Sequence, residues 1–322
     1  MRFSNPVRLA CASVFLFAVL YPIAGASILT SEDVRARIVL ESYRRAFPDK
    51  IRSVEWKDGD WAALVDGKTF YWARGRLLPD EKREDWPDYK SYVFYAYPDE
   101  PRDPATFTKG KIEDLRRQGE SEARASGADH HAAFRTALYG GASRASAERS
   151  IVKTTLFGHG VSVHAMIAPA IRRVDAAVKE AAAKDGDVAA FMKGISTLGG
   201  YNWREIRGTT RRSYHSWGLA VDVQPKKLGN KAIFWEWEKE RNPDWMLVPH
   251  ASRWSPPAAV VKAFEKEGFV WGGKWDFYDN MHFEYRPELH ELSKVFAATG
   301  GKEARLANLE NEAARTGAGR SN

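Results

Sequence analysis

The sequence is poor in long apolar segments. A sustained apolar run lies between Leu9 and Ile23, after two arginines, and the small residues Ala24-Gly25-Ala26 follow it. A basic start, a short apolar centre and a small-residue site form the pattern of a cleavable signal peptide. A membrane anchor is the rival interpretation, but the run is short and is broken by Pro22. We therefore expect residues 1–26 to be removed, which leaves an exported protein of the periplasm or cell envelope, or a secreted one, without a stable membrane span.

Cysteine is almost absent. Cys11 is the single cysteine of the 322 residues, and it lies before most of the apolar run, which is the wrong order for a lipid-modified cysteine. After cleavage the mature chain has no thiol. Disulfides, thiolate metal ligands and cysteine nucleophiles are therefore excluded for it.

The chain also lacks a concentrated block of one charge. Its formal charge is +7, from 49 basic and 42 acidic residues, and loss of the signal segment leaves 47 basic residues and a charge of +5. The basic residues are dispersed, so the composition does not favour a nucleic-acid partner. A weakly basic exported protein is better suited to a polyanion of the envelope such as peptidoglycan.

The most informative stretch is residues 213–222, Ser-Tyr-His-Ser-Trp-Gly-Leu-Ala-Val-Asp. After Gly218 large apolar residues alternate with small or polar ones, which predicts a strand with Asp222 on the face opposite the large side chains. Gly218 allows the backbone to turn just before that strand. The imidazole of His215 and the carboxylate of Asp222 can therefore converge.

A second stretch, residues 279–284, reads Asp-Asn-Met-His-Phe-Glu. Polar and aromatic residues alternate from His282, which predicts a neighbouring strand and makes His282 the best third ligand. Two histidines and one carboxylate, with a position left for water, are the usual composition of a catalytic Zn2+ site, although other divalent ions accept the same ligands. Asp279 is placed to act as general base toward a metal-bound water, which is the chemistry of amide hydrolysis.

The combined pattern, S-x-H-x-x-G-x-A-x-D followed by D-x-x-H, resembles a family of zinc peptidoglycan peptidases. That family groups VanY-like D-alanyl-D-alanine carboxypeptidases with L-alanyl-D-glutamate endopeptidases, and the resemblance covers roughly residues 152–296. It implies His215, Asp222 and His282 as zinc ligands and Asp279 as the acid/base. At the acid/base position, held here by Asp279, the carboxypeptidase branch usually has a glutamate in E-x-x-H. The sequence D-x-x-H-F-E is instead similar to the endopeptidase branch. We therefore favour the endopeptidase, with the carboxypeptidase as the alternative.

Residues beside the two motifs are candidates for substrate binding or ligand orientation. The resemblance places a substrate-holding arginine at Arg204, with Arg207 as the nearby alternative, and either can equally be a solvated charge. Ser213 matches a family position associated with substrate hydrogen bonding, or is a simple turn hydroxyl. Glu284 either orients a ligand or faces solvent.

The fold that we expect is α+β. Residues 27–150 would form a small mixed accessory domain, in which two Asp-Gly turns between residues 51 and 72 predict a β-meander and residues 103–150 a helical linker. Residues 151–296 would form the catalytic domain, a small antiparallel sheet with helices on one face and the zinc site on the other. Residues 297–322 would form a flexible tail.

Aromatic residues are dense in two places, residues 86–97 and residues 226–257. Rings in the first segment can stack on sugars, but we favour a packing role. The second segment either walls the cleft or packs over the sheet edge. A function of a different class, a non-catalytic zinc-containing protein that binds the cell wall, is disfavoured by Asp279, because a structural metal site has no use for a base.

Overall fold

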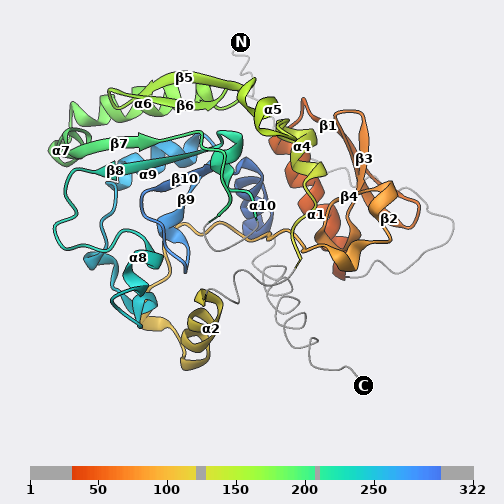
Figure 1. The fold of residues 1–322 in the computed structure, drawn as a ribbon, viewed down its shortest axis with the longest axis horizontal. Helices are drawn as coiled ribbons and strands as arrows, with labels where there is room; N and C mark the ends of the chain where they lie inside the picture. Colours follow the sequence, from red (N-terminus) through yellow and green to blue (C-terminus); the bar gives the residue numbers. More distant parts are fainter. Residues whose placement is uncertain (1–30, 121–127, 207–210, 299–322) are drawn as a thin grey trace, which may run out of the picture.

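The computed structural model describes residues 31–120, 128–206 and 211–298 (Figure 1). Helices and antiparallel sheets alternate along these residues, so the predicted α+β class is confirmed. The predicted signal segment, Arg207 and nearly all of the predicted tail lie outside the described residues. No helix within the described ranges combines the length and the apolar character needed to cross a membrane.

The first part of the chain is a helix packed on a small sheet. Helix α1 (Ser31–Ala46) precedes four antiparallel strands: β1 (Ile51–Lys57), β2 (Asp60–Val65), β3 (Lys68–Tyr71) and β4 (Leu78–Pro79). Both Asp-Gly pairs have positive φ at both residues, as tight hairpin turns require. The predicted meander is confirmed, and β4 is a short fourth strand that the turn pattern does not predict.

Helices and one hairpin connect this sheet to the second half. The helices are α2 (Lys109–Gly119), α4 (Ala133–Tyr139) and α5 (Arg144–Glu148), as predicted for a mostly helical stretch. Strands β5 (Ile151–Leu156) and β6 (His159–His164) then form a separate hairpin. Helices α6 (Ala168–Ala182) and α7 (Gly186–Gly194) follow, and α6 lies along the hairpin in Figure 1.

A second four-stranded antiparallel sheet carries the two motifs. Its strands, in spatial order, are β7 (Ile195–Gly199), β8 (Ala220–Pro225), β10 (His282–Tyr285) and β9 (Phe269–Trp271). Helix α8 (Trp235–Lys239) lies between the motifs and helix α9 (Ala258–Lys266) follows it. The Phe264 ring of α9 stacks on Phe283 of β10 with centroids 3.9 Å apart, so α9 covers one face of this sheet. His282, the neighbour of Phe283 along β10, and Asp222, the cross-strand partner of His282, belong to the opposite face.

One hydrophobic core runs through both halves of the chain. It extends from Leu40 of α1 through Phe94 and Val174 to Leu292 of the last described helix, α10 (Pro287–Ala298). Helices α1 and α10 lie side by side. The division at residues 150/151 stays a prediction, and the buried residues continue across it.

The two aromatic segments serve packing. Tyr92, Phe94 and Tyr97 are buried in the main core, in agreement with the packing role favoured from the sequence. Trp235 and Trp245 belong to a smaller core together with Leu115, Ala232, Met246, Val248 and Tyr278. The tryptophan-rich segment therefore supplies most of a smaller core, which Leu115 and Tyr278 complete.

Candidate metal centre

His215 is presented by a single helical turn, η5 (Tyr214–Trp217). The hydroxyl of Ser213 caps this turn by accepting a hydrogen bond from the His215 N–H at 3.3 Å. Gly218 ends the turn with φ of 67°, and a Cβ there would lie 2.7 Å from the backbone nitrogen of His164. A side chain at residue 218 would therefore collide with the hairpin, so the glycine is required for this turn.

Asp222 and His282 face each other across the sheet. They occupy directly opposite positions in the register of β8 and β10, which confirms the predicted neighbouring strands. His282 Nδ1 lies 2.8 Å from Asp222 Oδ1, and His215 Nε2 lies 3.2 Å from Asp222 Oδ2. One ligand atom from each of the three residues falls within a 4.8 Å span. The structure thus brings together the three residues predicted as metal ligands.

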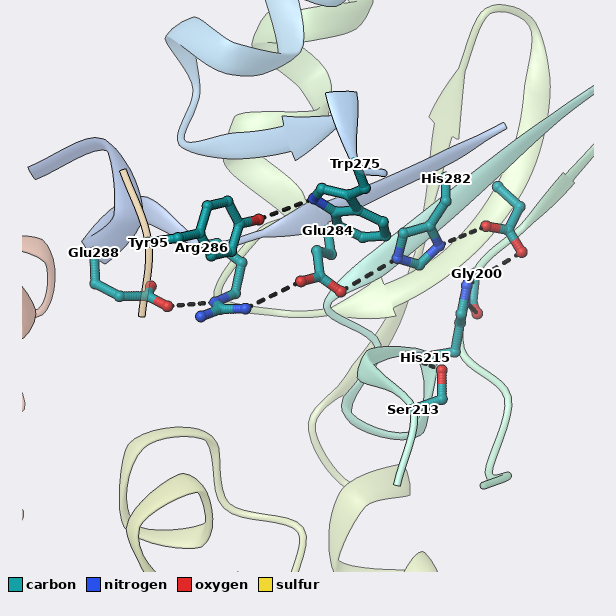
Figure 2. Close-up of polar contacts among 10 residues, drawn as sticks. Tyr95, Gly200, Ser213, His215, Trp275, His282, Glu284, Arg286 and Glu288 are labelled. Carbon is teal, nitrogen blue, oxygen red and sulfur yellow. Dashed lines mark hydrogen bonds and ion pairs between the residues drawn. The ribbon is translucent and has the colours of Figure 1, made fainter. Parts of the chain in front are cut away.

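The hydrogen bonds of His215 leave one ring nitrogen ready to bind a metal. Its Nδ1 lies 2.6 Å from the carbonyl oxygen of Gly200 (Figure 2). A carbonyl only accepts, so Nδ1 carries the proton and Nε2 keeps a lone pair. Although Nε2 is close to Asp222, it is buried and has no hydrogen-bond partner. An unpartnered buried nitrogen beside a carboxylate fits a metal ligand.

The second histidine is held from the other side. His282 Nε2 lies 3.3 Å from Glu284 Oε2, while Nδ1 faces Asp222 (Figure 2). Glu284 is only 8% exposed. Of the two roles open for Glu284 from the sequence, the structure supports contact with the ligand rather than exposure to solvent.

Charge in the cluster favours a cation. Burial opposes ionisation of Asp222, but attraction to His215 and the hydrogen bond with His282 outweigh it and hold the pKa of Asp222 below its usual range. Burial also opposes charge on His282, yet its contacts with Asp222 and Glu284 raise its pKa well above the usual value. Positive charge is therefore stabilised between His282 and Asp222. A divalent cation would take over that place as the proton leaves.

Asp279 lies on the approach to β10. Its N–H donates to the Gly272 carbonyl at 3.0 Å, and its Oδ1 is buried without a hydrogen-bond partner. Burial raises the pKa of Asp279 to about 7; nearby His282 opposes the rise and the charge of Asp222 adds to it. A carboxyl group that titrates near neutral pH is suited to accept and return a proton.

The predicted substrate-binding residues differ in position. Arg204 is exposed, and its positive charge is felt at Asp279, where it lowers the pKa. Its backbone N–H is held by Ser216 Oγ at 2.9 Å. Ser213 is buried and its observed contact is the cap of the His215 turn. Arg207 lies outside the described residues, and substrate contacts by all three stay predictions.

Comparison with known families agrees with this geometry. Residues 207–285 match a family model described as D-alanyl-D-alanine carboxypeptidase, and this segment contains His215, Asp222, Asp279 and His282. The resemblance to VanY-like peptidases is confirmed. Peptidases of this family depend on a metal, and the match supports a metallopeptidase. Residues 39–94 match a domain of unknown function, and no solved structure matches the chain.

Two supporting groups of this ligand cluster are not predicted from the sequence. The Gly200 carbonyl fixes the ring of His215, and a Cβ at Gly200 would lie 2.2 Å from the carbonyl oxygen of Ser162. The Trp275 ring lies 5.6 Å from the ring of His282 and donates its N–H to the Tyr95 hydroxyl at 2.9 Å. The glycine pair at residues 199–200 is a signal for close backbone contact, whereas nothing local marks the contact between residues 95 and 275.

The arrangement can carry out metal-assisted hydrolysis. His215, Asp222 and His282 would hold the ion through two nitrogens and a carboxylate oxygen. An ion held by three protein groups keeps a coordination position for water or substrate. Asp279 is a partly buried proton acceptor outside the ligand set, three positions before His282, so binding of the ion and transfer of the proton fall to separate residues.

Proposed function

We propose that this protein hydrolyses an amide bond in the stem peptides of peptidoglycan, with Zn2+ as its metal. The observation that carries the proposal is the ligand cluster, whose atoms lie within 4.8 Å of one another, combined with the unpartnered carboxyl oxygen of Asp279. A structural metal site needs no such base. The non-catalytic alternative leaves the buried carboxyl group of Asp279 without a role.

The chemistry that zinc supplies when bound is polarisation of the scissile carbonyl and a lower pKa of bound water. In the proposed reaction, the water oxygen bonds to the carbonyl carbon while the carboxylate of Asp279 takes a proton from that water. Asp279 then returns that proton to the nitrogen as the carbon–nitrogen bond breaks. Its pKa of about 7 suits both steps.

Substrate recognition in this proposal depends on Arg204. Stem peptides carry carboxylates, and an exposed guanidinium within electrostatic range of Asp279 would hold one of them near the reacting bond. Ser213 and Arg207 are secondary candidates for the same role. Arg204→Ala is expected to raise KM much more than it lowers kcat if the contact forms equally in substrate and transition state.

For the scissile bond we propose L-alanyl-D-glutamate, because Asp279 and the sequence D-x-x-H-F-E are similar to the endopeptidase branch. The second candidate is the D-alanyl-D-alanine bond, which is favoured by the description of the matching family model. We also propose export to the periplasm or cell envelope. N-terminal sequencing of protein secreted by the native cell should then begin at Ser27.

Digestion of purified peptidoglycan tests the proposal. The mature protein and Asp279→Ala, at equal zinc content, are incubated with it and the released fragments are identified by mass spectrometry. New amino-terminal D-glutamate supports the endopeptidase, and loss of terminal D-alanine supports the carboxypeptidase. If both proteins hold one zinc ion and release nothing, the peptidase proposal is wrong. The alternative, a non-catalytic zinc-containing protein that binds the cell wall, then takes its place.

A further inference from the structure

A row of buried charges extends behind His282, away from the other two ligands (Figure 2). We infer that Glu284, Arg286 and Glu288 are positioning residues that keep the proton of His282 on Nε2 and so reserve Nδ1 for the metal. The inference rests on the proposed metal site. It assigns a role to three residues that take no direct part in the proposed reaction.

The contacts form an uninterrupted row. His282 Nε2 lies 3.3 Å from Glu284 Oε2, and the other carboxylate oxygen accepts a hydrogen bond from Arg286 Nη1 at 3.1 Å. Arg286 Nε donates to Glu288 Oε1. The exposed fractions are 9% for His282, 8% for Glu284, 7% for Arg286 and 2% for Glu288. Water therefore has little access with which to replace these contacts.

His282 has a carboxylate beside each ring nitrogen, Asp222 at Nδ1 and Glu284 at Nε2. With a metal ion bound on the side of Asp222, the contact with Glu284 would select one neutral form of the ring. A neutral imidazole carries a single proton, and an ionised carboxylate only accepts hydrogen bonds. With the proton on Nε2 the ring donates to Glu284, and the lone pair of Nδ1 faces Asp222. With the proton on Nδ1, two lone pairs would face each other at Glu284. Hydrogen bonds of this kind fix the ring form of metal-binding histidines and raise their basicity.

Arg286 explains how Glu284 can remain ionised in a buried position. An isolated buried carboxylate is costly, and a pair of hydrogen-bonded opposite charges reduces that cost. Arg286 lies between two carboxylates, and its guanidinium carbon is 5.2 Å from the centre of the Tyr214 ring. Tyr214 precedes His215 in the turn η5. The same row therefore connects the strand of His282 with the turn of His215.

The two histidines are predicted to bind through different nitrogens, which gives the test an internal reference. His215 is held at Nδ1 by the carbonyl of Gly200 and offers Nε2, whereas His282 is held at Nε2 and offers Nδ1. The full mature chain, labelled with 15N-histidine and loaded with 113Cd2+, is examined by NMR. We expect cadmium–nitrogen coupling at Nε2 of His215 and at Nδ1 of His282. Coupling at Nε2 of His282 in the unmodified protein would by itself overturn the inference.

Variants then test the cause. Glu284→Ala should weaken metal binding about 10–100-fold in a chelator competition and change the His282 resonances while those of His215 stay in place. Glu284→Gln keeps an acceptor and should restore part of the affinity. The matched control is Glu267→Gln, which removes a similarly shielded carboxylate, 14% exposed, that pairs with Arg173 away from the site.

The outcomes separate this inference from the proposed function. If the unmodified protein binds neither Zn2+ nor Cd2+, the metal site itself is wrong. If it binds metal and Glu284→Ala retains both the affinity and the His282 coupling, the positioning role is wrong. Should Glu284→Ala fail to fold, Glu284→Gln and the coupling pattern of the unmodified protein still decide, because an unchanged affinity in Glu284→Gln would also contradict the inference.

Discussion

Single residues at the site differ in ways that their sequence context only partly reveals. His215 and His282 are both predicted ligands, yet one is held by a backbone carbonyl and the other by a carboxylate. The residue types and their spacing are enough to predict the ligands. The hydrogen-bond partner of the other ring nitrogen in each histidine depends on which residues the fold places beside that ring. For His215 the partner is the backbone carbonyl of Gly200, which a pattern of side chains cannot predict.

The carboxylate of Asp222 is the centre of the cluster, because it contacts both histidines. Asp222→Asn removes the negative charge while keeping the size of the side chain. We expect its zinc affinity to fall by more than about 100-fold, since loss of a ligand should exceed the effect of losing a residue behind a ligand. Metal content after dialysis against a chelator measures this. Asp175→Asn, which removes a carboxylate paired with Lys179 on α6, should retain the metal; equal loss in both variants would contradict the prediction.

Asp279 is expected to reduce stability while it serves catalysis. Its pKa is raised to about 7 in the folded protein, so between its unfolded value of about 4 and pH 7 the folded state binds more protons than the unfolded state. The stability of the metal-free protein should therefore fall as pH rises through this range. Asp279→Asn should remove that contribution and be more stable at pH 8, by an amount on the order of a few kcal/mol, while losing activity.

Urea unfolding of the metal-free proteins at pH 5 and pH 8 measures this difference. Asp276→Asn is the matched control, because Asp276 is a nearby acid that pairs with Lys111 and lies outside the cluster. The control should lack the gain at pH 8. If Asp279→Asn is instead less stable than the unmodified protein at pH 8, the contacts of the Asp279 carboxylate stabilise the fold, and its burial does not reduce stability.

Among the elements, strands with a local signal are predicted and those without one are not. Asp-Gly turns predict the first meander, and alternation predicts β8 and β10. Strand β5 has no clean alternation and pairs with β6 in a separate hairpin, so the sequence does not predict it. The opposed positions of Asp222 and His282 are also not predicted, because strand register depends on how distant segments pack.

The junction between β6 and the loop after β7 depends on Gly200. Gly200→Ala would place a Cβ 2.2 Å from the Ser162 carbonyl, which must move and separate the two elements. Since the Gly200 carbonyl holds His215, we expect both lower stability, by about 1–3 kcal/mol, and weaker zinc binding. Thermal unfolding and zinc competition measure the two effects. Gly160→Ala in β6 meets no atom within 4 Å and serves as control; similar behaviour of the two variants would show that the contact at Gly200 is unimportant.

At the scale of the whole molecule, an early segment supports the site. The Tyr97 hydroxyl donates to Glu265 at 2.6 Å and accepts from the Trp271 N–H at 2.9 Å. Lys274 pairs with the same glutamate at 2.7 Å, just before Trp275 and the loop to Asp279. The two contacts of Tyr97 join residues 168 and 174 positions apart in the chain. Local patterns carry no information about such pairs, so the sequence predicts the aromatic segment as core without indicating what it contacts.

The predicted catalytic part, residues 151–296, should therefore not fold alone. Removal of residues 27–150 would uncover α10, which packs on α1, and Tyr285, whose ring contacts Phe47. Burial of apolar surface supplies most folding free energy, so an uncovered core of this extent favours the unfolded chain. We expect the fragment to show no cooperative thermal transition, with or without zinc, while the mature chain shows a single one.

Tyr97→Phe examines the same dependence without deleting a segment. It leaves Glu265 without one partner, so we expect a loss of about 1–3 kcal/mol in unfolding free energy and a measurable fall in zinc affinity transmitted through Lys274 and its loop. Tyr89→Phe, in the same aromatic segment but with no hydroxyl contact to the second sheet among the described residues, is the control.

A fragment that unfolds cooperatively and binds zinc as tightly as the mature chain would show that the catalytic half is independent. In that case Tyr97→Phe should change stability alone, because the early segment would then be only packed on the site and would not hold its loop in place.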